Sequence, residues 1–144
     1  APAYVGIPVT HRRAGSSVPF VTGHDEIYKG RPAVDWRALA ACSDGLVIYM
    51  GLHNLARICE ELQAGGLAGT TPAAIIQQGS VNGQKHLIAT LEDLADAADE
   101  QGFSAPAIVV IGEVVEQRIP GCAPMPAPVT MPQPIARSPQ DAPA

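Results

Sequence analysis

Short apolar runs separated by turn residues divide the chain into candidate strands. Residues 45–50 form a continuous apolar run, which is typical of a central strand that is buried on both faces in a parallel sheet. Apolar runs at 72–77 and 105–111 predict two further strands. The β-branched and aromatic residues at 17–22 predict another strand, and a second short strand is expected at 85–90.

Helical patterns lie between these strands. Across 52–62 apolar residues recur every three or four positions, which predicts an amphipathic helix that the glycines at 65–66 end. Asp35 is a capping residue type followed by helix formers, so a short helix is expected at 35–40. A third helix is expected at 91–101. Because strands and helices alternate, the predicted fold class is α/β.

Glycine-bearing turns follow three of the predicted strands, after Met50, Gln78 and Ile111. In an open α/β sheet, ligands bind at the carboxyl ends of the strands. Glycine also lets a ligand approach the backbone closely, although from sequence alone it is at least as often an ordinary turn residue. We therefore expect all three turns to line a ligand site.

The composition is that of a soluble globular domain, with 47% apolar and 16% charged residues. A net charge of −5 argues against a nucleic-acid partner, because such binding needs Lys and Arg on the phosphates. No apolar run reaches the roughly 20 residues of a membrane-spanning helix, so we expect no membrane partner and a cytoplasmic location. From 119 to 144, frequent prolines and the loss of hydrophobic periodicity predict a disordered tail.

The cysteines and histidines indicate no metal chemistry. The three cysteines are widely spaced and form no CxxC pair, so reduced structural thiols are expected. The four histidines show neither the HxH nor the HExxH spacing that would bring two of them to one ion. No metal site is predicted.

Several motifs stand in a fixed order: GIPVTHR at 6–12, VTGH at 21–24, DW at 35–36 and YMGL at 49–52. Their order and spacing resemble the tetrapyrrole (corrin/porphyrin) methylases of the uroporphyrinogen-III C-methyltransferase type. The similarity continues through PAAIIQQGS and SAPAI and covers about residues 1–118. The departures from the family's usual residues are Val9 for leucine, Ser80 for threonine and Ala89 for glycine.

The resemblance implies the C-terminal lobe of a two-lobed enzyme, with a mixed sheet flanked by helices at 1–118, a tail at 119–144, and no N-terminal lobe. Family members bind S-adenosylmethionine in the cleft between the lobes. By match to the motifs, Met50 and Gly79 would contact this methyl donor. Tyr49, Ala107 and Ile108 would line its adenine side. A thioether and small turns suit a flat, partly apolar purine.

The resemblance also implies a tetrapyrrole substrate with many carboxylates. Arg12 is the best candidate to bind them, because its guanidinium can donate two parallel hydrogen bonds to a carboxylate. His11, Thr22 and His24 would assist. The implied reaction is C-methylation of uroporphyrinogen III to precorrin-2, in the siroheme and cobalamin branch of porphyrin biosynthesis.

The family's acid, base and glycine-rich loop motifs belong to its N-terminal lobe. We therefore expect no catalytic residue in this chain, and weak or no activity from the chain alone. A homodimer is expected of the full-length form. The chain can be a truncated piece or one part of a split enzyme. Two other functions stay open: another cobalamin-pathway precorrin methyltransferase, or a non-catalytic ligand-binding module of the same fold.

Overall fold

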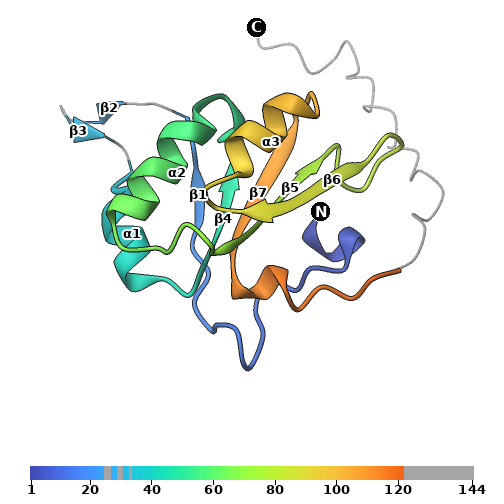
Figure 1. Cartoon of the computed structure of the whole chain (residues 1–144), viewed down its shortest axis with the longest axis horizontal. Coiled ribbons are helices and arrows are strands. Elements are labelled where there is room, and N and C mark those ends of the chain that lie inside the picture. Colours follow the sequence, from blue (N-terminus) through green and yellow to red (C-terminus); the bar gives the residue numbers. More distant parts are fainter. Residues whose placement is uncertain (25–26, 29–30, 33, 122–144) are drawn as a thin grey trace, which may run out of the picture.

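The structure, a computed structural model, describes residues 1–24, 27–28, 31–32 and 34–121. Its centre is a five-stranded sheet with the spatial order β1-β4-β7-β5-β6 (Figure 1). Strand β1 pairs in parallel with β4, and every other neighbouring pair is antiparallel. The expected mixed sheet is confirmed, but β4 has only one parallel neighbour. The strands are β1 (Phe20–Thr22), β4 (Gly45–Tyr49), β5 (Pro72–Gln77), β6 (Lys85–Thr90) and β7 (Ala107–Gly112).

Three α-helices cover one face of the sheet, and they are α1 (Trp36–Cys42), α2 (Leu55–Ala64) and α3 (Leu94–Glu100) (Figure 1). The apolar stripe predicted across 52–62 faces the sheet: Ile58 and Leu62 of α2 are fully buried there. They pack with Ile48, Ile75 and other alternate strand residues. The first turn of the predicted helix is the 3-10 helix η2 (Leu52–Asn54).

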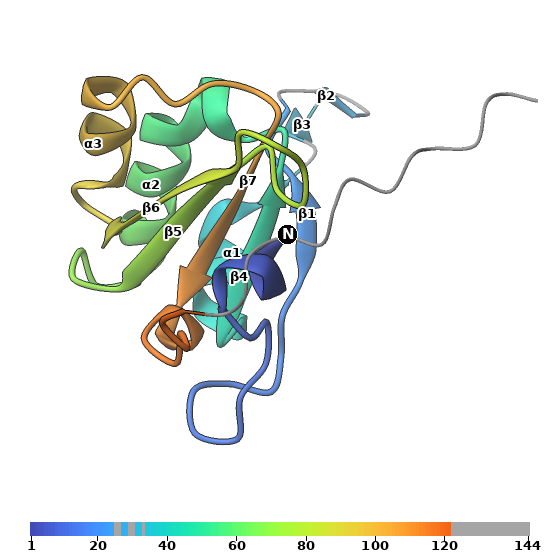
Figure 2. The same cartoon turned by 90° about the vertical axis from the view of Figure 1, so that its right-hand side faces the viewer.

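The opposite face of the sheet carries no α-helix in the described part of the chain. Two 3-10 helices, η1 (Pro2–Val5) and η3 (Glu113–Val115), cover part of it (Figure 2). Val47, Ile76 and Val110 point to this side and form a second buried cluster with residues of η1 and η3. Because neighbouring strand residues alternate between two buried faces, the central strands are apolar at nearly every position, and the buried Gln77 at the end of β5 is an exception.

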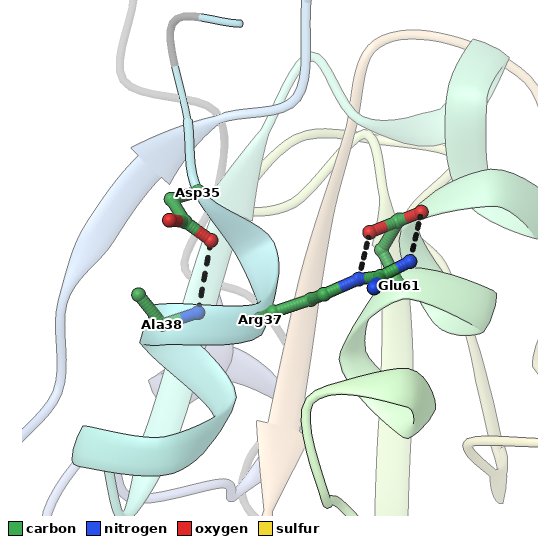
Figure 3. Close-up of polar contacts among 4 residues, drawn as sticks. All are labelled: Asp35, Arg37, Ala38 and Glu61. Atoms are coloured by element: carbon green, nitrogen blue, oxygen red, sulfur yellow. Dashed lines mark hydrogen bonds and ion pairs between the residues drawn. The ribbon is translucent and has the colours of Figure 1, made fainter.

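Asp35 caps α1 as its residue type predicts, since a carboxylate oxygen accepts a hydrogen bond from the Ala38 backbone amide at 3.0 Å (Figure 3). In the same first turn, Arg37 donates from Nε and Nη2 to the two carboxylate oxygens of Glu61, at 2.7 and 3.3 Å. This forked ion pair joins α1 to α2. Exposed pairs of this kind add little stability because water screens the two charges, so buried apolar contacts dominate this helix–helix interface.

Two short strands between β1 and α1 are not among the predicted elements. Strand β2 (Ile27–Tyr28) pairs antiparallel with β3 (Arg31–Pro32) as a separate two-stranded ladder.

The first residue of the predicted tail is attached to the folded domain, because Ile119 donates its amide to the Gly6 carbonyl at 3.0 Å. Its remainder, 122–144, lies outside the described residues. No helix in the described ranges is long and apolar enough to span a membrane.

Candidate functional site

The carboxyl ends of β1, β4 and β5 meet at one edge of the sheet, which we call the ligand edge. Strands β4 and β5 run in the same direction because each is antiparallel to β7, which lies between them. Met50 and Gly79 therefore follow neighbouring strand ends, and the start of β7 at Ala107 lies between them. The expectation for the third turn is wrong: Gly112 pairs with Gly45 at the opposite edge, because β7 is antiparallel.

Backbone strain is concentrated at the ligand edge. Among the described residues, the non-glycine residues with positive φ are Met50 at 52°, Gln78 at 49° and Ser80 at 70°. All three follow the last residues of β4 and β5. A side chain in this left-handed region costs of order 1–3 kcal/mol, and such residues cluster at functional sites. The turns after β4 and β5 are thus both strained and both lie at the same edge of the sheet, as expected of a preformed binding site.

An exposed apolar surface borders the turn after β4. Met50 is 66% exposed, and Phe20 and Tyr49 are 59% and 43% exposed. The Phe20 and Tyr49 rings lie 6.4 Å apart between centroids on the face without α-helices. Ile108 pairs opposite Tyr49 and packs with the buried cluster of that same face. Ala107 instead packs with the helix-side cluster, so its side chain does not join the Tyr49 and Ile108 side chains.

The turn after β4 is braced by the turn after β1. Gly23 donates its amide to the Tyr49 carbonyl at 2.7 Å, and the Asn54 side chain donates to the Gly23 carbonyl at 2.9 Å. The two turns are in such close contact that a Cβ on Gly23 would collide with Gly51. Thr22 lies beside Tyr49 in the strand register. The VTGH and YMGL motifs therefore form one unit at the ligand edge, with Thr22 and exposed His24 on it.

The turn after β5 is tied to the loop that leads into β7. Gln78 donates its amide to the Pro106 carbonyl at 2.9 Å, and the Gln77 side chain accepts from the Ser104 amide at 2.8 Å. Gln77 is buried, so this bond also satisfies a polar group that would otherwise be costly to bury. Gly79 lies directly against Ala1. A Cβ at position 79 would collide with Ala1, so the close contact requires glycine. The neighbourhood of Gly79 is therefore rigidly held.

Arg12 and His11 lie at the opposite edge of the sheet. With Thr10, Arg13 and Asp44 they line an open hollow of about 640 Å³ before the amino ends of β1 and β4. Asp44 in the wall of this hollow and Met50 are six residues apart along the extended β4, which is about 20 Å. The structure thus brings Thr22 and His24, but not Arg12 and His11, next to Met50.

Asp44 organises this hollow. Its Oδ2 accepts hydrogen bonds from the backbone amides of Ser16 and Ser17 at 2.9 and 3.0 Å, and from the Ser17 hydroxyl at 3.0 Å. The backbone hydrogen bonds, first from Ser16 and then from Ser17, lower the pKa of Asp44 below its ordinary value. The carboxylate is therefore a structural anchor for the loop. It leaves the exposed arginines Arg12 and Arg13 available to other anions.

The motifs of the ligand edge belong to a known family. A model of the Tetrapyrrole (Corrin/Porphyrin) Methylases matches residues 1–95, which include η1, the ligand-edge turns after β1, β4 and β5, and the hollow. The chain belongs to this family. Within the family it is similar to a uroporphyrinogen-III C-methyltransferase of Synechocystis, with 48% identity over 115 residues. It is also similar to a siroheme synthase of Pseudomonas paraeruginosa, with 47% identity over 116 residues.

The methylase fold is also found among solved structures. A Thermus thermophilus uroporphyrin-III C-methyl transferase, complexed with S-adenyl homocysteine, superposes with a TM-score of 0.64 at 29% identity. The alignment covers 77% of this chain and 48% of that one. The Synechocystis and Pseudomonas matches cover 80% and 81% of this chain, but 44% and 24% of those relatives. The chain therefore spans half or less of the methylases that it matches.

Sequence reasoning missed three contributors to the methylase ligand edge. Phe20 was assigned to a strand without a role, because its exposure beside Tyr49 depends on the pairing of β1 with β4. The side-chain amide of Asn54 carries no signal in the sequence beyond being a polar group near a strand end. Gln84 is among the residues that carry the family resemblance, but the hydrogen bond that its side chain accepts from the Ser80 amide does not follow from the sequence. No group of three His, Cys, Asp or Glu side chains suited to a metal occurs in the described part of the chain.

Proposed function

We propose that the ligand edge forms one wall of a site for S-adenosylmethionine. The proposal is carried by one observation: the exposed, left-handed Met50 and the strained turn around Gly79 lie at the carboxyl ends of β4 and β5, on either side of β7, at the positions where the family motifs stand. The exposed thioether and aromatic rings suit the apolar parts of the donor, and the turn backbone suits its polar groups. The Thermus relative is complexed with S-adenyl homocysteine, which is what this donor becomes after it loses its methyl group, and this supports the same donor.

We further propose that the whole protein methylates uroporphyrinogen III at carbon, as the names of its relatives suggest. Two successive transfers, each using one donor, would yield precorrin-2, the product that the family resemblance implies. In each transfer a pyrrole carbon attacks the methyl group, the sulfonium becomes a neutral thioether, and the macrocycle loses a proton. Orientation of donor and acceptor supplies most of the catalysis in such a reaction. The group that accepts the proton would lie in the part of the relatives that this chain does not match.

The predicted substrate residues divide into two groups under this proposal. Thr22 and His24 lie beside the donor and would contact the reacting side of the macrocycle. Arg12 and His11 line the hollow at the other end of β4, about 20 Å from Met50 along the strand, and would meet a peripheral carboxylate only if the ligand spans that distance. A tetrapyrrole with carboxylate arms is large enough to require such separate contacts, and a guanidinium is well suited to a carboxylate.

Calorimetric titration of the chain with S-adenosylhomocysteine tests the donor proposal. Met50→Ala should weaken binding about tenfold, since it removes an apolar contact of about 1.4 kcal/mol. Ile88→Ala is the matched control: Ile88 is also exposed and apolar, but lies on β6, a strand that ends away from the ligand edge. No binding by the wild-type chain at millimolar concentrations, or equal effects of both substitutions, would contradict the proposal.

Activity of the isolated chain tests the division of roles. Under the proposal, the purified chain does not convert uroporphyrinogen III, because the proton acceptor is on another part of the protein. Production of a methylated tetrapyrrole by the chain alone, detected by mass spectrometry, would show that all required groups lie within these residues. The donor site would stand in that case, and the proposed location of the acceptor would be wrong.

A further inference from the structure

The turn that contains Gly79 is held by a side chain from the next strand. Gln84 Oε1 accepts a hydrogen bond from the Ser80 amide at 2.7 Å. Ser80 is one of the left-handed residues, with φ of 70°, and its backbone would relax without an external partner. The hydrogen bond therefore acts directly on the amide of a left-handed residue of the turn.

Gln84 is itself firmly placed, so it can serve as an anchor. It immediately precedes β6, and the next residue, Lys85, pairs with Gln77 in the sheet. Lys85 also donates to the carbonyls of Gln101 and Gly102 at 3.3 and 3.0 Å, and lies 4.2 Å from the Phe103 ring centroid. The backbone of Gln84 is thus fixed by the rigid sheet. The turn that the Gln84 side chain holds lies beyond the end of the sheet.

The loop between Gln78 and Gln84 also closes on itself. Val81 donates its amide to the Gln78 carbonyl, and Gln84 donates its amide to the Val81 carbonyl, each at 3.2 Å. Gly83 has φ of 89°, and a Cβ there would come within 2.6 Å of the Gln78 side-chain oxygen. These contacts fold the loop into a compact shape, but only the Gln84 side chain binds the amide next to Gly79.

We propose that Gln84 is a positioning residue for the ligand edge: its side-chain oxygen holds the Gln78–Ser80 turn in the left-handed form that presents Gly79 to the donor. This inference rests on the proposed function of the same edge. A turn that is set before binding spares the ligand the ordering of that turn, so loss of the bond should appear as weaker affinity. Gln84 need not contact the ligand.

Two substitutions separate the hydrogen bond from the size of the side chain. Gln84→Glu keeps an acceptor oxygen at the same position, and Gln84→Met keeps a similar length without one. Gln63→Met is the matched control, because Gln63 makes a 3.3 Å bond to the Cys59 carbonyl within α2, away from the ligand edge. Nuclear magnetic resonance spectra of each variant report its fold, the exchange rate of the Ser80 amide, and affinity for S-adenosylhomocysteine.

Gln84→Met should weaken binding about fivefold, as expected for the loss of one exposed hydrogen bond, and should speed exchange of the Ser80 amide. Gln84→Glu and Gln63→Met should bind within about twofold of the wild type. The Gln84 inference alone fails if the wild-type chain binds and Gln84→Met binds equally well, or if Gln84→Glu is as weak as Gln84→Met. If the wild-type chain does not bind, the proposed function fails, and the positioning role fails with it.

Discussion

At Met50 the usual stability order of alanine and glycine should be reversed. Met50 has φ of 52°, where an L-residue costs roughly 1–2 kcal/mol and glycine does not. Part of this cost is offset, because the unfolded chain has less conformational entropy with alanine than with glycine. This entropy difference stabilises the alanine variant by about 0.4–1 kcal/mol. Met50→Ala and Met50→Gly remove the same side chain, so the lost contacts of the thioether cancel in the comparison.

The difference between the two variants should be about 1 kcal/mol in favour of Met50→Gly. For a domain of this size that corresponds to a melting temperature about 4 °C higher, which circular dichroism resolves easily. Urea unfolding of the same pair gives the free energy directly. Ala56, exposed on α2, supplies the reference, because Ala56→Gly should show the ordinary order and lose about 1 kcal/mol.

A result in which Met50→Ala equals or exceeds Met50→Gly in stability would refute the reasoning. It would mean that Met50 does not occupy the left-handed region in solution, and that the strain ascribed to this turn is not present. If the order is reversed as expected and both variants bind S-adenosylhomocysteine more weakly than the wild type, then the methionine is retained at a cost to stability. That combination is typical of a residue kept for binding.

Three further predictions concern the scaffold. Asp35→Ala should lower the free energy of unfolding by about 1 kcal/mol through loss of the helix cap; an unchanged urea midpoint would contradict this. Hydrogen bonds from Ser16–Ser17 lower the pKa of Asp44, so its stabilising effect is complete above about pH 4 and is lost as the pH falls through the lowered pKa. The unfolding energies of wild type and Asp44→Ala should therefore converge in acid, and a constant difference would count against the anchor. Burial raises the pKa of Cys59 to about 11, so alkylation mapped by mass spectrometry should modify exposed Cys42 and spare Cys59 until unfolding; equal rates would contradict the burial.

Local patterns predicted the elements because their causes are local. Asp35 caps α1 through a bond three residues away, and the apolar stripe of α2 follows from helical periodicity alone. The direction of β7 was not predictable in this way, because an apolar run that is buried on both faces reads the same in a parallel or an antiparallel strand. Its long-range pairing moved Gly112 to the edge opposite Met50.

The candidate site was predictable only in part, for a similar reason. The motifs identified Met50 and Gly79, but methionine has no preference for the left-handed region that would reveal its strained backbone. The motif that ends at Arg12 is close in sequence to VTGH, yet the two lie at opposite ends of β1 because the chain runs the length of the sheet between them. The resemblance assigns both motifs to one substrate, whereas the structure places them in two separate regions.

The most direct test is a magnetic resonance titration of the chain, labelled at methionine methyl groups and backbone amides, with S-adenosylhomocysteine. If the ligand edge binds the donor, the Met50 methyl and the Gly79 and Ser80 amides shift together and saturate with one affinity. Saturable binding that shifts residues around the Arg12 hollow and leaves Met50 and Gly79 unchanged would contradict the assignment of the donor to this edge.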